Sequence, residues 1–198
     1  MHIRKAAPVD TDGIMTVIEE ARRTIAALGI DQWQNGSPNR AMIEEDIALG
    51  RSYCVVSAAA EVHTAEKGLR CPETAELPAD GQTGVWGTFA LLEDGEPTYD
   101  RIYDGAWLTP HRDSAECPTY LAIHRVAIAV AKRGSGISTA IVEYAAQKAR
   151  SLGRRSLRID THEGNAVMRR MLTKHGFIHC GTIFLQNGDK RVAYERVL

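Results

Sequence analysis

The sequence predicts one α/β domain built on a mixed β-sheet with helices on both faces. Three observations lead to this prediction. Strand-like and helix-like stretches alternate along the chain in the order β-α-α-β-β-β-α-β-α-β-β. The second half contains one β-α-β unit, which brings two parallel strands together through a crossover. The chain then ends in two strand-like runs joined by Asn187-Gly188, a dipeptide typical of tight antiparallel hairpins.

The N-terminal part is predicted to contain two strands and two helices. Residues 2–6 form a short strand, and Asp10-Thr11-Asp12 then supplies the polar residues that begin a helix. The second helix covers residues 39–49, and the strand after it covers residues 52–60. In the first helix the apolar residues repeat at helical spacing and end at Gly29, which defines one buried face: Ile14, Val17, Ile18, Ala21, Ile25 and Leu28.

Two long connections interrupt the middle of the chain. Residues 61–84 are rich in proline, glycine and charge and show weak periodicity, so they are predicted to form a loop or hairpin insertion. A strand over residues 84–92 resumes the sheet, and residues 94–118 form a second connection, rich in Tyr and Trp. The sequence thus predicts a single domain over residues 1–198 with an insertion at 61–84.

The second half has the clearest pattern. Strands are predicted over residues 120–130 and 156–160, with a helix between them, and a further helix over residues 165–175 stops before Gly176. Residues 177–186 and 190–197 form the closing hairpin. The helix between the two strands is marked by the apolar positions Ile137, Ile141, Tyr144, Ala145 and Leu152.

Charge and composition argue against several classes of protein. The formal net charge is −1 at pH 7, so no overall field favours nucleic acid or an anionic membrane. No apolar run approaches the ~20 residues of a membrane span, and the first residues lack the apolar core of a signal peptide. Cys54, Cys71, Cys117 and Cys180 form no CxxC pair, which predicts neither a zinc site nor a disulfide framework. A reducing cytoplasm is the expected location.

A glycine-rich turn, Arg133-Gly134-Ser135-Gly136, lies between a predicted strand and a predicted helix. Such a turn exposes backbone N–H groups at a helix start, where phosphate groups bind. It is not a Walker A loop, because Ile137-Ser138 follows where Lys-Ser or Lys-Thr is required. A dinucleotide fingerprint is an alternative, with Thr139 at the third glycine position and Asp160 as the ribose ligand. Its late position in the chain, before an antiparallel hairpin, argues against that alternative.

Two motifs resemble those of the GNAT superfamily of N-acetyltransferases. The run from Val126 to Ser138, VAIAVAKRGSGIS, is similar to the family's R-x-x-G-x-G/A motif, with Ser138 at the last position. Residues 176–181, GFIHCG, follow a helix that opens at Asn165 and resemble the family's second motif. The resemblance spans nearly the whole chain except residues 61–84. It implies the GNAT fold, in which strands 120–130 and 156–160 splay apart.

The resemblance implies an acetyl-CoA site between those two strands. The pantetheine arm would pair with the backbone of the first strand, and the pyrophosphate would lie on N–H groups at the start of the next helix. Gly134 and Gly136 would be needed because a Cβ would block this approach. Asn165 is a preferred N-cap residue and, in the family, also touches pantetheine. The implied cofactor-binding residues are Val126, Ala127, Ile128, Arg133, Gly134, Ser135, Gly136, Ile137, Ser138 and Asn165.

His124 is the candidate general base. It lies at the level where the family often places a base, and an imidazole, with an unperturbed pKa of about 6.5, suits that role. Arg125 alternates to the other side of the strand and is interpreted as structural or paired with an acid. The tyrosine acid usual in the family falls at Leu172 in this sequence. Tyr144 and Tyr194 are the substitutes considered for the acid.

The acceptor site is expected in the loops after the first helix and before the fourth strand, which wall this site in the family. The substrate-binding residues expected there are Trp33, Gln34, Tyr103 and Trp107, accompanied by Asn35 and Tyr99. His162-Glu163 is half of an HExxH motif, but Ala166 replaces the second histidine. No metal is therefore expected.

These residues predict a cytoplasmic N-acetyltransferase that transfers an acetyl group from acetyl-CoA to a primary amine. The acceptor, a small-molecule amine or a protein amine, is not identified by the sequence. Two alternatives stay open: a catalytically silent CoA-binding module, suggested by the missing tyrosine, and an NAD(P)-dependent oxidoreductase. Neither nucleic acid nor a membrane is expected as a partner, and a homodimer is compatible with the sequence.

Overall fold

A computed structural model describes residues 1–57 and 84–198. The predicted insertion at 61–84 therefore lies outside the described residues, except for Gly84. The last residues of the strand predicted over 52–60 lie outside them as well. Within them, the element order is the predicted one. The elements are β1 (His2–Lys5), α1 (Thr11–Ala26), α2 (Arg40–Ala48), β2 (Ser52–Val56), β3 (Val85–Leu92), β4 (Tyr120–Ile128), α3 (Ile137–Ser151), β5 (Ser156–Thr161), α4 (Ala166–Lys174), β6 (Ile178–Phe184) and β7 (Lys190–Val197).

Side-chain caps and short turns set several of these boundaries. Asn39 caps α2 by accepting a hydrogen bond from the N–H of Met42 at 3.0 Å. Asn165 caps α4 in the same way, accepting from the N–H of Met168 at 3.1 Å. Strand β4 ends two residues earlier than predicted, because Val130–Lys132 form a short 3₁₀ turn.

The described strands form one sheet in the order β1-β2-β3-β4-β5-β7-β6. Every neighbouring pair in it is antiparallel except β4 and β5, which are parallel. The predicted mixed sheet and the closing β6–β7 hairpin are thus confirmed. A dinucleotide-binding fold requires a run of parallel strands, and the described sheet contains only this one parallel pair.

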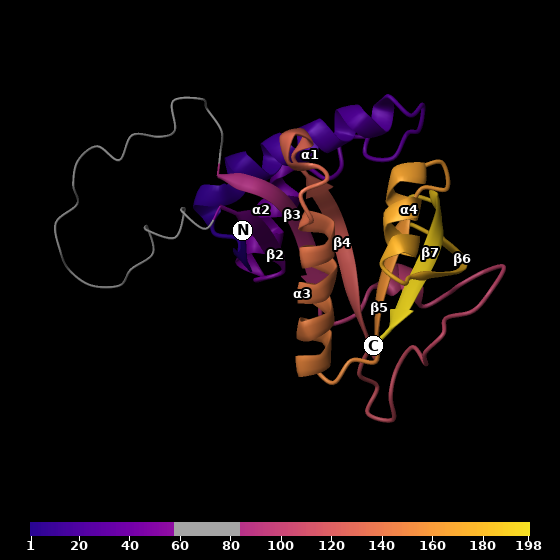
Figure 1. The fold of residues 1–198 in the computed structure, drawn as a ribbon. Helices are drawn as coiled ribbons and strands as arrows, with labels where there is room; N and C mark the ends of the chain where they lie inside the picture. Colours follow the sequence, from indigo (N-terminus) through magenta and orange to yellow (C-terminus); the bar gives the residue numbers. More distant parts are fainter. Residues whose placement is uncertain (58–83) are drawn as a thin grey trace, which may run out of the picture.

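The helices cover both faces of the sheet (Figure 1). Helices α1 and α2 pack on one face, where Ile14, Ile18 and Ile43 meet Cys54 and Ala127. Helices α3 and α4 pack on the other face through residues such as Ile141, Ala145 and Leu172. The apolar stripe predicted for the first helix is confirmed up to Ile25, since Leu28 is exposed beyond the helix end.

Strands β4 and β5 are neighbours for a short distance only. Their register joins Tyr120–Ala122 to Ser156–Arg158, and beyond these residues the two strands diverge (Figure 1). The splay that the family resemblance implies is therefore confirmed. Because none of the described strands pairs with β4 on this side past Ala122, backbone groups there are left for other partners.

A buried ion pair lies at the closed end of this splay. The Nε of Arg158 is 3.0 Å from Oε1 of Glu195, and both side chains are fully buried. The guanidinium lies 4.2 Å from the ring centroid of Trp107 and 4.1 Å from that of Tyr120. Glu195 also accepts a hydrogen bond from the N–H of Leu108 at 2.5 Å. These contacts attach the long connection before β4 to the sheet.

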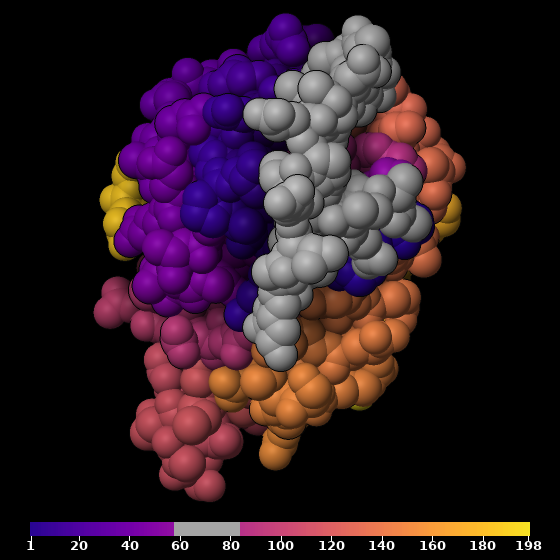
Figure 2. Space-filling view, turned by 90° about the vertical axis from the view of Figure 1, so that its left-hand side faces the viewer, coloured from indigo at the N-terminus to yellow at the C-terminus, as the bar shows by residue number. Residues whose placement is uncertain are grey.

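The same connection covers the outer edge of β6. The N–H of Tyr103 donates to the carbonyl of Thr182 at 2.8 Å, and the N–H of Thr182 donates back at 2.7 Å. Gly105 lies so close to the strand that a Cβ would come within 1.9 Å of the Cys180 carbonyl oxygen. The tip of the connection, around residues 112–117, projects from the rest of the surface (Figure 2).

None of the helices in the part of the chain that the structure describes combines the length and apolarity needed to cross a membrane.

Removing the carboxylate of Glu195 should destabilise the fold strongly. In Glu195→Ala the buried Arg158 charge loses its partner, and the expected loss of unfolding free energy is about 3–5 kcal/mol. Urea denaturation of both variants measures it. Glu143→Ala is the control, because it breaks a surface pair with Arg196 and should cost less than ~1 kcal/mol. Equal losses in the two variants would contradict the role given to the buried pair.

Candidate functional site

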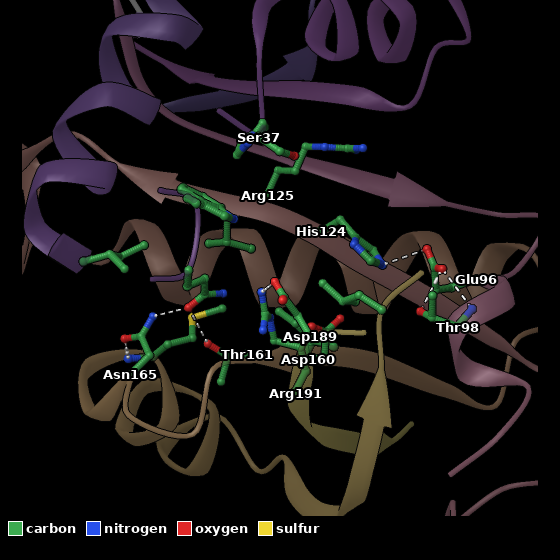
Figure 3. Close-up of a pocket in the computed structure, with 18 of the residues that line it drawn as sticks. Ser37, Glu96, Thr98, His124, Arg125, Asp160, Thr161, Asn165, Asp189 and Arg191 are labelled. Atoms are coloured by element: carbon green, nitrogen blue, oxygen red, sulfur yellow. Dashed lines mark hydrogen bonds and ion pairs between the residues drawn. The ribbon is translucent and has the colours of Figure 1, made fainter. Parts of the chain in front are cut away.

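A cavity of about 390 Å³ lies where β4 and β5 diverge. One wall is β4 from Ile123 to Val126, and the facing wall is β5 from Ile159 to Thr161 together with the start of α4. The loop between α1 and α2, the turn after β3 and the β6–β7 hairpin complete the lining (Figure 3). Pockets of this size and mixed polarity are typical of small-molecule sites.

A β-bulge shapes the β4 wall. Between the pairs Ala90–His124 and Thr88–Ala127, β4 has one more residue than β3, and Arg125 takes a φ of 54°. The Arg125 side chain forms an ion pair with Asp46 of α2, as the sequence suggested. Burial raises the pKa of Asp46, an effect that the positive charge of Arg125 opposes.

His124 projects from β4 into the cavity (Figure 3). Its ring stacks on that of Tyr99, with centroids 5.9 Å apart and an angle of 23° between the planes. Its Nε2 lies 3.4 Å from Oε2 of Glu96, which follows β3. The candidate base is therefore held on a buried aromatic ring beside a carboxylate.

Asp160 presents a second carboxylate from the β5 wall. Its Oδ1 accepts a hydrogen bond of 2.8 Å from the hydroxyl of Tyr99, which is fully buried. Burial, together with the charge and hydrogen bond of Asp160, holds the pKa of Tyr99 well above its usual value of about 10. Tyr99 therefore remains a hydrogen-bond donor to Asp160 across the physiological pH range.

Gln32 ties the α1–α2 loop to the opposite wall. Its Oε1 accepts hydrogen bonds from Nδ2 of Asn165 at 3.2 Å and from the N–H of His162 at 3.4 Å. The hydroxyl of Thr161 is a third donor, at 3.5 Å. This amide connects the α1–α2 loop to the end of β5, and it also orients Asn165, whose Oδ1 caps α4.

The backbone of β4 faces the splay at alternate residues. The N–H of Ala129 donates to the carbonyl of Trp86 in β3 at 3.0 Å. Because backbone groups alternate along a strand, those of Val126 and Ile128 point the other way, toward β5. They are suitably placed to pair with an extended ligand. Ala127 is buried against α1 and α2 and presents its side chain to that layer.

The glycine-rich turn leads from β4 into the first turn of α3. Gly134 and Gly136 have φ values of 78° and 85°, and Gly136 is the N-cap residue of a helix with no side-chain cap. The first N–H groups of α3 are therefore available to an anion. A Cβ on either glycine would meet no protein atom within 4 Å. Within the chain, glycine is therefore favoured at these two positions because of the positive φ and not because of a steric clash.

The other residues expected at the cofactor loop take two different places. Arg133 and Ser135 are exposed on the turn, and Nη2 of Arg133 donates to Oγ1 of Thr24 in α1 at 2.9 Å. Ser138 lies in the first helical turn, where its hydroxyl is 3.4 Å from Nε2 of His175. Ile137 instead points into the core and is 1% exposed.

The expected acceptor residues divide into two groups. Trp33 and Asn35 line the cavity, whereas Gln34 is exposed and donates to the carbonyl of Arg22. Tyr103 lies on the edge of β6, outside the cavity lining. Trp107 is also outside that lining, because it packs on Arg158 and bonds the carbonyl of Tyr99.

The tyrosines considered as acids lie outside the cavity lining. Leu172, at the family's usual tyrosine position, is fully buried in the core. Tyr144 packs against Tyr53 and Phe89. The hydroxyl of Tyr194 accepts a hydrogen bond from Arg169. The described residues also contain no group of three or more His, Cys, Asp or Glu side chains placed to hold a metal.

Several polar cavity residues were not predicted as part of an acetyl-transfer site, among them Gln32, Glu96 and Asp160. Gln32 is next to Trp33, and the sequence placed Trp33 and its loop in the acceptor site. Asp160 was predicted only as a ribose ligand, in the dinucleotide-binding alternative. Glu96 lies in a long irregular connection and carries no pattern that would single it out.

A mixed sheet with splayed central strands, next to an uncapped helix led by glycines, defines the class of GNAT-fold acetyltransferases. The sequence matches the Acetyltransferase (GNAT) family over residues 70–177, which is more than half of the chain. The chain therefore belongs to this family, whose members use acyl-CoA co-substrates. The resemblance inferred from the two motifs is confirmed.

Solved structures of bacterial acetyltransferases share this fold. A GNAT family acetyltransferase from Streptococcus agalactiae 2603 is 31% identical, with a TM-score of 0.72, and the match covers 100% of this chain and 95% of that one. One from Listeria monocytogenes 4b F2365 is 18% identical, with a TM-score of 0.64 and coverage of 100% and 94%. No curated protein matches the sequence.

Replacing Tyr99 by Phe should remove the buried hydrogen bond to Asp160. The expected loss is about 1.5–3 kcal/mol of unfolding free energy at pH 7, since the acceptor is charged. Above pH ~10 the unfolded chain releases the Tyr99 proton while the folded chain keeps it, so this residue makes wild-type stability fall as pH rises. The decline should be shallower in Tyr99→Phe. Urea denaturation from pH 7 to 11 tests both points, and parallel curves would contradict the second.

Proposed function

We propose that the protein, as one domain over residues 1–198, transfers an acetyl group from acetyl-CoA to a primary amine. The observation that carries this proposal is the continuous arrangement along β4. The strand offers unpaired backbone groups at Val126 and Ile128, leads through the glycine-rich turn into the start of α3, and presents His124 to the cavity from its middle. One strand thus serves a donor and an acceptor.

The residues present fit the donor. A pyrophosphate is doubly charged and suits the uncapped first turn of α3, where the helix dipole favours anions. The positive φ of Gly134 and Gly136 directs that turn, and the open space around both leaves room for a ligand. An extended pantetheine arm can pair with Val126 and Ile128 as an added strand, and Asn165 borders the same gap.

His124 is proposed as the base that prepares the acceptor. An alkyl ammonium has a pKa of about 10.4, so at neutral pH it must lose a proton before it can attack. His124 accepts that proton, which leaves the amine neutral beside the gap. Bound acetyl-CoA supplies the acetyl group as a reactive thioester. The N–H of Val126 faces the gap and can donate to a carbonyl oxygen there.

The absence of a tyrosine acid favours one other candidate, a CoA-binding protein without catalysis. Leu172 cannot donate a proton, and none of the described tyrosines lines the cavity. A thiolate is nevertheless a fair leaving group, since a thiol has a pKa of about 8.5, and water can protonate it. The cavity and its polar residues beside the donor site therefore favour the transferase.

Gly136 should be required for donor binding beyond its effect on stability. Gly136→Ala places a side chain at φ 85° where the pyrophosphate is proposed to lie, and its dissociation constant for CoA should rise at least tenfold. Gly153→Ala is the matched control, because Gly153 has a φ of 68°, equal open space and a place at the far end of α3. Isothermal titration with acetyl-CoA, CoA and NADH measures binding. Binding of NADH alone would overturn the donor assignment.

His124→Ala should lower the rate of acetyl transfer and flatten its rise with pH. A positioned general base contributes roughly 10²–10⁴-fold, so a loss in this range is expected in kcat. CoA release from acetyl-CoA, followed from pH 6 to 9 over a panel of primary amines, provides the measurement. An unchanged pH profile would rule out this role. If none of the amines causes CoA release although the protein binds CoA tightly, the result would instead favour the CoA-binding protein without catalysis.

A further inference from the structure

Glu96 lies beside the candidate base, on the side away from the acceptor cavity's centre. It follows β3 and opens the short turn Pro97–Tyr99. Its Oε2 is 3.4 Å from Nε2 of His124, and the two side chains are 15% and 21% exposed. Figure 3 shows the carboxylate on one side of the imidazole and the open cavity on the other. The contact joins two elements that are far apart in sequence.

The carboxylate of Glu96 is fixed independently of His124. Its Oε1 accepts hydrogen bonds from the N–H of Thr98 at 3.1 Å and from the Thr98 hydroxyl at 2.9 Å. The backbone N–H of Glu96 donates to the hydroxyl of Tyr120 at 3.0 Å. One oxygen and the main chain are therefore committed, and only Oε2 is left to face the imidazole.

The imidazole is equally constrained. The Tyr99 ring stacks against one face of His124, and β4 fixes its attachment. The Nε2 atom is buried and makes no hydrogen bond to any described residue. A buried polar nitrogen without a partner is costly, and Glu96 Oε2 is the carboxylate oxygen within reach. A small rotation of either side chain closes the 3.4 Å separation, as is common for catalytic contacts in ligand-free enzymes.

The other charged groups near His124 are already paired. Asp46 forms an ion pair with Arg125, and Asp160 accepts the hydrogen bond of Tyr99. Glu96 is thus the carboxylate whose free oxygen is directed at the imidazole. A carboxylate at one ring nitrogen sets the tautomer and leaves the other nitrogen's lone pair for the substrate.

We propose that Glu96 is a positioning residue that holds the proton of neutral His124 on Nε2 and so directs the Nδ1 lone pair to the acceptor. This inference rests on the proposed function of His124. The N–H bond of the acceptor ammonium breaks as an N–H bond forms at Nδ1, which leaves a neutral amine and an imidazolium. The Glu96 carboxylate, beside the Nε2 proton, stabilises this cation. After transfer, the Nδ1 proton returns to solvent.

Nitrogen-15 spectra of histidine-labelled protein test the arrangement without an acceptor. At a pH where the His124 ring is neutral, the His124 signals of the wild type should show a single tautomer, with the proton on Nε2. Glu96→Leu, which keeps an apolar side chain of similar size but removes the oxygen, should show a mixture of both tautomers. A mixture in the wild type, or identical spectra in the two proteins, would overturn the proposal.

Kinetics test whether Glu96 acts through His124. Glu96→Gln should lower kcat about 10- to 100-fold and leave KM for acetyl-CoA within about twofold. Asp94→Asn is the matched control, because it removes one exposed charge from the same connection and should leave kcat unchanged. In the His124→Ala background, Glu96→Gln should cause no further loss. Losses that multiply would show a separate role and overturn the proposal.

The two outcomes of interest are distinguishable. A wild type that binds CoA yet acetylates no amine contradicts the proposed function, and the spectra then decide the Glu96–His124 arrangement alone. Active protein with multiplying losses contradicts only the role of Glu96. Thermal denaturation of each variant separates a loss of folded protein from a loss of rate.

Discussion

The structure depends on the divergence of two parallel strands at the centre of the sheet. Strands β4 and β5 share three residue pairs and then separate, which leaves a row of backbone groups without a neighbouring strand. At the closed end, the buried ion pair of Arg158 with Glu195 joins β5 to β7, and the Arg158 guanidinium also lies over the ring of Tyr120 in β4. At the open end, Gln32 joins the α1–α2 loop to the end of β5 and the start of α4 through three hydrogen bonds. The cavity lies between these two sets of contacts.

The parts of the fold that could be predicted from the sequence are those determined by short-range sequence patterns. Helical spacing, the Asn39 and Asn165 caps and the Asn187-Gly188 turn each act over a few residues, and the order of elements follows from them. The start of α3 was predicted for the same reason, because the glycine-rich turn is continuous in the chain. Boundaries shifted where a tertiary contact intervened, as at Val130, whose N–H bonds to Glu20 of α1.

The site was harder to predict because its walls come from distant segments. Glu96 and His124 meet across the β3–β4 pair, and the bulge at Arg125 resets which side chains share a face there. No pattern around Glu96 announces that contact. The aromatic residue Trp107 was expected to bind the acceptor, but it is half-buried and stacks on the buried Arg158. An aromatic side chain in a loop signals burial, and the sequence does not state which surface it is buried against.

The bridge between Tyr103 and Thr182 also bears on how copies of the chain can meet. An exposed strand edge invites pairing with another molecule, because its N–H and C=O groups are unsatisfied. Along β6 the chain's own connection covers this edge. It takes the hydrogen-bonding positions of Thr182 and Cys180, and it packs Gly105 against Cys180. Extending the sheet into a neighbouring molecule at β6 would first require this connection to peel away. Continuous sheet pairing between copies that preserves the folded monomer must therefore use a different strand edge.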